Sequence, residues 1–179
     1  MKAVASLLLT GALVTMLQAA DPESSLTPIR IKEIPEKQFF CLKKELLMAE
    51  VQAFAAEKFQ ELVRKATQLR LGQKGPLVLT ISGYQGDPTK TFTAEVDFPY
   101  AEQNDDYKGA YAYRTAPKFK CASVIYQGPI GGTGESWGKL VQAAIAAGHQ
   151  PTGESREVFL DFEGPDSKDN IIELQLGID

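Results

Sequence analysis

The sequence contains few of the residues that most catalytic and metal sites require. It has one His and two Cys in 179 residues, whereas a structural zinc site takes four Cys or His ligands. A Ser-His-Asp or Cys-His system would have to use His149, and no Ser or Asp spacing around it suggests a triad. Axial ligands for haem are equally scarce. We therefore expect no metal and no cofactor.

The chain also lacks an excess of positive charge. Lys and Arg number 19 against 23 Asp and Glu, which gives a net charge of -4, and no run of like charges forms a basic tail. A nucleic-acid surface needs a basic face to neutralise phosphates. We therefore expect no nucleic-acid partner.

Charge is absent altogether from residues 3–20, which follow Met1 and Lys2 and have a leucine-rich centre. This pattern predicts a secretory signal peptide over residues 1–20, and hence a periplasmic or secreted mature chain over 21–179. An uncleaved anchor is the alternative, because 18 uncharged residues approach the length that spans a bilayer. We expect no stable membrane span once the signal is removed.

An internal similarity links the two halves of the chain. When residues 81–98 are set over 159–176, Gly86 meets Gly164, Lys90 meets Lys168 and Glu95 meets Glu173. This similarity predicts a single domain made of two repeats, at about 28–100 and 114–179. A polar, Tyr-rich segment at 101–113 is expected to connect them.

Each repeat is predicted to form a strand, a helix and two further strands. Helical spacing of apolar residues marks helices at 49–70 and 133–147, and Gly72 is expected as a left-handed stop. The predicted strands are 38–43, 77–84, 92–98, 120–127, 157–162 and 170–176. We therefore predict an α+β fold, an antiparallel sheet with both helices on one face and a ligand groove on the other.

The second repeat resembles a known family. The stretches 121–129, 137–140, 148–153, 156–159 and 171–176 are similar to GyrI-like (gyrase-inhibitor-like) small-molecule-binding domains, which also form the effector-binding domain of AraC-type regulators. The resemblance covers about residues 28–179. It implies a tandem strand-helix-strand-strand fold, with a groove on the helix-free face where an acidic residue of the last strand contacts cationic or polar ligands. Glu173 matches that position.

Strand alternation supports this choice independently of the resemblance. If Ile172 and Leu174 face the helices, Glu173 points to the other face, and Glu95 does the same in the first repeat. We expect aromatic groove walls from Tyr84, Tyr126, Phe159 and Trp137, with Phe162 in the core. The plainer alternatives are that the two glutamates are simply solvated, and that Tyr126 and Trp137 belong to the core.

The sequence thus favours an exported protein that binds an amphipathic or cationic small molecule. The resemblance also implies an alternative, because some relatives of this fold are similar to hydrolases of reactive small molecules. In that case Glu173 would act as the general base or orient the water, with Tyr126 as donor, so enzymatic activity stays open. An interaction surface on the Tyr-rich connector is a third option. Cys41 and Cys121 lie on corresponding predicted strands, where a disulfide could join the halves, and two unpaired buried thiols are the alternative.

Overall fold

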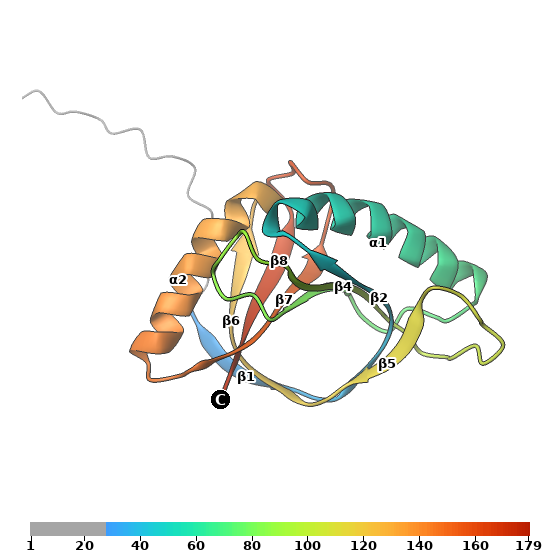
Figure 1. The fold of residues 1–179 in the computed structure, drawn as a ribbon, viewed down its shortest axis with the longest axis horizontal. Coiled ribbons are helices and arrows are strands. Elements are labelled where there is room, and N and C mark those ends of the chain that lie inside the picture. Colours follow the sequence, from blue (N-terminus) through green and yellow to red (C-terminus); the bar gives the residue numbers. More distant parts are fainter. Residues whose placement is uncertain (1–27) are drawn as a thin grey trace, which may run out of the picture.

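Residues 28–179 are described by the computed structural model, and they form an eight-stranded antiparallel sheet with two long helices (Figure 1). In chain order the elements are β1 (Arg30–Ile34), β2 (Lys37–Leu46), α1 (Val51–Gln68), β3 (Leu77–Ser82), β4 (Phe92–Pro99), β5 (Ala112–Ala116), β6 (Phe119–Gln127), α2 (Thr133–Ala146), β7 (Pro151–Asp161) and β8 (Ile171–Ile178). The predicted signal peptide lies outside the described residues. Between residues 28 and 179, neither helix combines the length and hydropathy of a membrane-crossing segment.

The sheet has a symmetrical strand order, β1-β6-β8-β7-β3-β4-β2-β5. The order strand, helix, strand, strand occurs twice along the chain, as β2-α1-β3-β4 and as β6-α2-β7-β8, and β3 and β7 meet at the centre of the sheet. The predicted α+β architecture is therefore confirmed.

Two strands differ from the prediction. Short β1 and β5 form the two edges of the sheet, and each pairs with the long first strand of the other half, β1 with β6 and β5 with β2. Residues 112–113, expected in the connector, thus begin β5. A strand of five residues is too short to show a clear alternation in the sequence, and β1 and β5 are identified only by their hydrogen-bonded pairing with β6 and β2.

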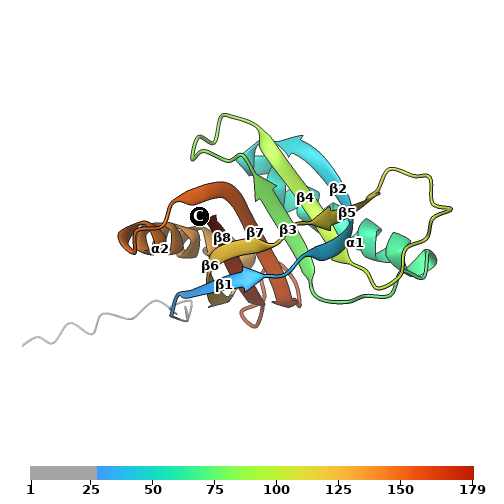
Figure 2. The ribbon, with the colours of Figure 1, turned by 90° about the horizontal axis from the view of Figure 1, so that it is seen from below.

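Both helices cover the same face of the sheet, as predicted (Figure 1). Figure 2 shows the opposite side, with β1, β6 and β5 in front of the helices. Helix α1 buries Phe54, Leu62 and Ala66 at helical spacing. Its left-handed stop is Arg70, with a φ of 57°, after which Leu71 N–H donates to the carbonyl of Ala66 over 3.1 Å. Gly72, the stop predicted from the sequence, also has a positive φ, of 62°, but lies two residues beyond the one that ends the helix.

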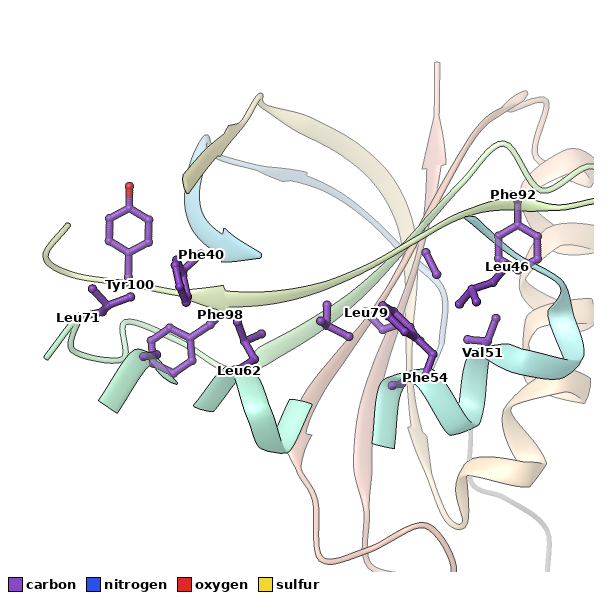
Figure 3. Close-up of a cluster of buried hydrophobic side chains, with 14 residues drawn as sticks. Phe40, Leu46, Val51, Phe54, Leu62, Leu71, Leu79, Phe92, Phe98 and Tyr100 are labelled. Atoms are coloured by element: carbon purple, nitrogen blue, oxygen red, sulfur yellow. The ribbon is translucent and has the colours of Figure 1, made fainter. Parts of the chain in front are cut away.

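The larger core lies beneath α1 (Figure 3). Val51 and Phe54 of the helix pack with Leu46, Leu79 and Phe92 of the sheet. A second core lies beneath α2, where Leu140 and Ala144 contact the apolar side of β6 and β8. Each helix therefore has its own core, which leaves the line between the helices free to form a site.

The Tyr-rich connector packs inward. The ring of Phe40, which has no exposed surface, lies 5.0–5.3 Å from the rings of Tyr107, Tyr111 and Tyr113. Tyr111 also donates a hydrogen bond to Glu61 of α1 over 3.3 Å. These contacts make the connector a cover for one end of the core.

Candidate ligand-binding cleft

A cleft of about 1900 Å³ lies on the helix-bearing face, between α1 and α2. We expected a groove on the other face, so its location is a correction to the sequence-based prediction. Side chains of β3 and β7 form the floor, and side chains of the two helices form the walls. The separation of the two helix cores leaves this central strip of sheet uncovered.

The floor follows from strand alternation. Leu77, Leu79 and Ile81 of β3 face the cleft, as do Ser155, Glu157 and Phe159 of β7. The walls are apolar and aromatic, with Phe59 and Val63 on α1 and Trp137 and Val141 on α2. An apolar lining with few polar groups is typical of sites for small organic molecules.

Glu157 is the acidic group on this floor. Its side chain is buried, and its Oε1 accepts a hydrogen bond from Trp137 Nε1 over 2.8 Å. The Thr133 hydroxyl, which donates to the carbonyl of Ile130 over 2.9 Å, is a second polar neighbour of this carboxyl. Burial raises the pKa of Glu157, because desolvation disfavours the carboxylate more than Trp137 and Thr133 favour it.

No basic side chain in residues 28–179 forms an ion pair with Glu157. Its hydrogen-bond donor Trp137 and its polar neighbour Thr133 are both neutral. A buried carboxylate without a counter-charge is costly. The cleft therefore offers a position that a positively charged or hydrogen-bond-donating group would stabilise.

A series of aromatic rings leads from the floor to the mouth of the cleft. Phe159 meets Phe59 edge-on at 5.3 Å and Phe162 at 5.6 Å. Phe162 and the neighbouring Leu160 are each 47% exposed. Phe162 was predicted for the core, but it lies just beyond the end of β7 and forms an apolar rim instead.

Three of the predicted wall residues line the cleft: Tyr84, Trp137 and Phe159. Tyr126 does not. Its ring is 1% exposed, and its hydroxyl donates to the carbonyl of Pro129 over 2.6 Å. Tyr126 thus packs in the core beneath the turn that precedes α2.

Glu95 and Glu173 lie on the helix-free face, as strand alternation indicated, and away from the cleft. Glu95 receives Arg114 of β5 at 2.5 Å and Lys43 at 3.4 Å. Glu173 receives Lys32 of β1 at 2.5 Å and a hydrogen bond from Ser123 over 2.8 Å. Both carboxylates therefore already have basic partners, which come largely from the two edge strands that the sequence did not reveal.

The two ion pairs occupy equivalent places in the sheet. Arg114 lies in the row Arg114–Phe39–Pro99, and Lys32 lies in the row Lys32–Cys121–Gly177. From each row the basic side chain of the edge strand reaches a glutamate in a different row. Arg114 contacts Glu95 of β4, and Lys32 contacts Glu173 of β8. The similarity between Glu95 and Glu173 found in the sequence thus corresponds to a contact that fastens an edge strand.

Burial and pairing compete in setting the charges on this face. Burial would raise the pKa of Glu173, but hydrogen bonds from Lys32 and Ser123 outweigh it and lower the pKa. Glu95 follows the same rule, because hydrogen bonds from Asp97 and Cys41 and the charge of Arg114 outweigh burial. Asp97 is fully buried, and its pKa is raised by desolvation and by the nearby Glu95.

The ligand atoms of Cys41, Glu95 and Asp97 lie close enough together to invite a metal interpretation. Arg114, however, contacts both carboxylates, at 2.5 Å to Glu95 and 3.1 Å to Asp97. A guanidinium in that position supplies the positive charge that a cation would bring. The cluster is an ion-pair network.

Cys41 and Cys121 are both buried and both free, so the disulfide considered from the sequence is not present. They lie on β2 and β6, which are separated in the sheet by β8, β7, β3 and β4. Burial raises the pKa of both thiols, that of Cys121 to about 11.

Glu157 is the residue that the sequence reasoning missed. It was placed on the predicted strand 157–162 without a role, while Phe159 was assigned to the groove. The two share a strand face, because side chains alternate along a strand. Strand alternation could therefore have pointed to Glu157 once Phe159 was chosen.

Comparison with known proteins identifies the family and supports the fold. A model of the GyrI-like small molecule binding domain family matches residues 27–178. No match was found among curated proteins.

Three solved structures share the fold at low sequence identity. EcmrR in a complex with DNA superposes with a TM-score of 0.67 at 18% identity, over 85% of this chain and 57% of EcmrR. SAV2435 bound to tetraphenylphosphonium gives 0.62 at 12% identity, over 86% and 94% of the two chains. A hydrolase from Listeria innocua gives 0.54 at 12% identity, over 84% and 91%. The chain therefore spans little more than half of the DNA-bound relative.

Proposed function

Because the chain belongs to the GyrI-like small-molecule-binding domain family, we propose that the cleft between α1 and α2 binds amphipathic organic cations and that Glu157 supplies the counter-charge. The observation that carries this proposal is a buried carboxyl on an apolar floor that forms no ion pair within residues 28–179.

A cation with apolar substituents suits both properties of the cleft. Its charge offsets the desolvation of Glu157, and its apolar groups are removed from water by the walls. Trp137 and Phe159 present aromatic rings beside the carboxyl, and a cation over such a ring gains about 0.5–2 kcal/mol. A small inorganic cation would leave the apolar lining unused.

The relative bound to tetraphenylphosphonium supports the choice of ligand class, since its ligand is a positive charge enclosed by four aromatic rings. At 12% identity it shows a shared fold, so the ligand is proposed here on the residues of this cleft. Tetraphenylphosphonium is a suitable first probe.

The test is calorimetric titration of tetraphenylphosphonium into residues 21–179 of the wild type and of two variants. Glu157→Gln keeps the acceptor for Trp137 and removes the charge, so the affinity should fall by about tenfold or more, equivalent to about 1.4 kcal/mol. Glu154→Gln is the matched control, because Glu154 also lines the cleft but lies beside Arg156, and its affinity should stay close to that of the wild type. Equal affinity in the wild type and Glu157→Gln would contradict the proposal.

Hydrolysis of a reactive small molecule is a second candidate. Two observations favour it: burial raises the pKa of Glu157 toward the range of a general base, and a hydrolase from Listeria innocua shares the fold. In this version Glu157 replaces Glu173 as the base. Turnover of a strained-ring electrophile that disappears in Glu157→Gln would support it, and a flat pH profile would remove Glu157 from the chemistry.

We further propose that residues 1–20 direct export and that the mature protein acts outside the cytoplasm. The uncharged, leucine-rich segment after Lys2 supports this proposal. Cell fractionation and N-terminal sequencing of the purified protein test it. A cytoplasmic protein that retains Met1 would contradict it.

The proposed partner is a small molecule and not a nucleic acid, although one relative of this fold is a DNA-bound regulator. The chain carries 23 acidic against 19 basic residues, which does not favour binding to phosphates. Absence of a mobility shift with duplex DNA at low salt is the expected result.

A further inference from the structure

The cleft has an approximate two-fold symmetry. At the centre of the sheet Leu79 of β3 lies directly opposite Glu157 of β7, with Leu77 opposite Phe159 and Ile81 opposite Ser155. Advancing a β3 position by 78 residues gives its counterpart on β7, as in the internal similarity between Glu95 and Glu173. An axis between Leu79 and Glu157 therefore exchanges the two halves of the cleft.

The walls obey the same relation. Residues 55, 59 and 63 of α1 and residues 133, 137 and 141 of α2 all line the cleft, and each pair is 78 positions apart. Val63 and Val141 are identical, while Phe59 and Trp137 are both aromatic. The two sides of the cleft thus have related outlines.

The polarity of the two sides differs in the region around Glu157. The α2 side has Glu157, Trp137, which donates a hydrogen bond to it, and the neighbouring hydroxyl of Thr133. The corresponding residues on the α1 side are Ala55, Phe59 and Leu79. At these three positions the α1 side is apolar. The residues of α1 that do add polar atoms to the cleft, Gln52, Gln60 and Arg64, include no carboxylate, so the α1 side offers no counter-charge for a cation.

We propose that the cleft binds amphiphiles with a single charged group in one fixed orientation, and that Leu79, Phe59 and Ala55 determine this specificity. The charged group lies on the α2 side at Glu157, and the apolar group lies on the α1 side. This inference rests on the proposed function and adds the direction of binding and the number of charges.

The same ligand can enter the cleft in two opposite orientations. In the favoured way the charge meets Glu157 and the apolar group meets Leu79 and Phe59. In the reversed way the charge is buried among apolar side chains, and the carboxyl of Glu157 stays unpaired, so both groups are desolvated without compensation. Because the outlines of the two sides are related, polarity decides between the two.

Trp137 provides a direct readout, since it is the single Trp of the chain and donates a hydrogen bond to Glu157. The probes are two forms of decyltrimethylammonium, one with a bromine on the carbon chain near the ammonium and one with the bromine at the far end. Bromine quenches indole fluorescence at short range. The form brominated near the ammonium should quench Trp137 more strongly, once the two are compared at equal occupancy by calorimetry.

An exchange of polarity tests the specificity residues. The double variant Leu79→Glu with Glu157→Leu keeps one carboxyl in the cleft but places it on the α1 side. If it folds by circular dichroism, the order of quenching should reverse. Equal quenching by the two probes in the wild type, or an unchanged order in the folded double variant, would overturn the inference.

The failure of the proposed function would look different. If the wild type bound neither probe and did not bind tetraphenylphosphonium, both proposals would fall together. Binding with equal quenching would leave the proposed function intact and remove only the fixed orientation. The wild-type comparison does not depend on whether the double variant folds.

Discussion

Arg114 offers the sharpest test of how the helix-free face is stabilised. Its guanidinium contacts Glu95 at 2.5 Å and Asp97 at 3.1 Å, and the exposed fractions of these carboxylate side chains are 6% and 0%. Replacing Arg114 by Met removes the charge and keeps most of the apolar stem. Two buried carboxyl groups then lose the partner that fastens β5 to the sheet.

The magnitude follows from the burial of the partners. Removing one member of a buried ion pair costs about 3–5 kcal/mol, and the 22% exposure of the Arg114 side chain argues for the lower end, about 3 kcal/mol. For a domain of this size that corresponds to a decrease in Tm of about 6–12 °C. The equivalent change Lys32→Met removes a half-exposed Lys from the single carboxylate of Glu173, and it should cost about 1 kcal/mol or less.

Urea unfolding at neutral pH, monitored by circular dichroism, measures both variants against the wild type. If Arg114→Met were no less stable than Lys32→Met, burial of the two carboxyl groups would not set the contribution of Arg114. A double-mutant cycle with Glu95→Gln isolates the contact, and a coupling energy near zero would show that Arg114 acts through packing alone.

Three further outcomes are expected. Glu157→Gln should be more stable than the wild type at a pH above the raised pKa of Glu157, because the folded variant buries no charge there, and the difference should vanish below the ordinary Glu pKa. Urea unfolding at several pH values measures the difference, and equal stability at every pH would contradict the prediction. Phe40→Ala should cost about 3–5 kcal/mol, because its fully buried ring supports the three connector tyrosines; a loss below about 1 kcal/mol in thermal unfolding would show that the connector packs without it. Cys41 and Cys121 should not react with a maleimide in the folded protein and should both react in urea; a chain that reacts in urea only after reduction would indicate a disulfide.

The main elements of the fold were predictable because local patterns specify them. Helix α1 shows its buried face in the spacing of Phe54, Leu62 and Ala66, and Gly72 indicates its end to within two residues of the left-handed Arg70. The long strands alternate clearly enough that Glu95 and Glu173 were assigned to the correct face. Edge strands β1 and β5 were not visible, since each is short and is defined by its partner in the other half.

The location of the site was harder to predict, because it depends on how the two halves meet. Strand alternation identifies the faces of a sheet but not which face stays open. The two edge strands that were not predicted, β1 and β5, bring Lys32 and Arg114 to the helix-free face. On the same face the guanidinium carbon of Arg156 lies 3.8 Å from the centre of the Phe119 ring. The space between α1 and α2 depends on two helices far apart in sequence, and no local pattern reports it.

A crystal structure of the complex with tetraphenylphosphonium tests the central claim most directly. The account predicts that the phosphonium lies between α1 and α2, with Glu157 as the nearest carboxylate and its phenyl rings against Trp137 and Phe159. A phosphonium on the helix-free face beside Glu173 or Glu95 would contradict it.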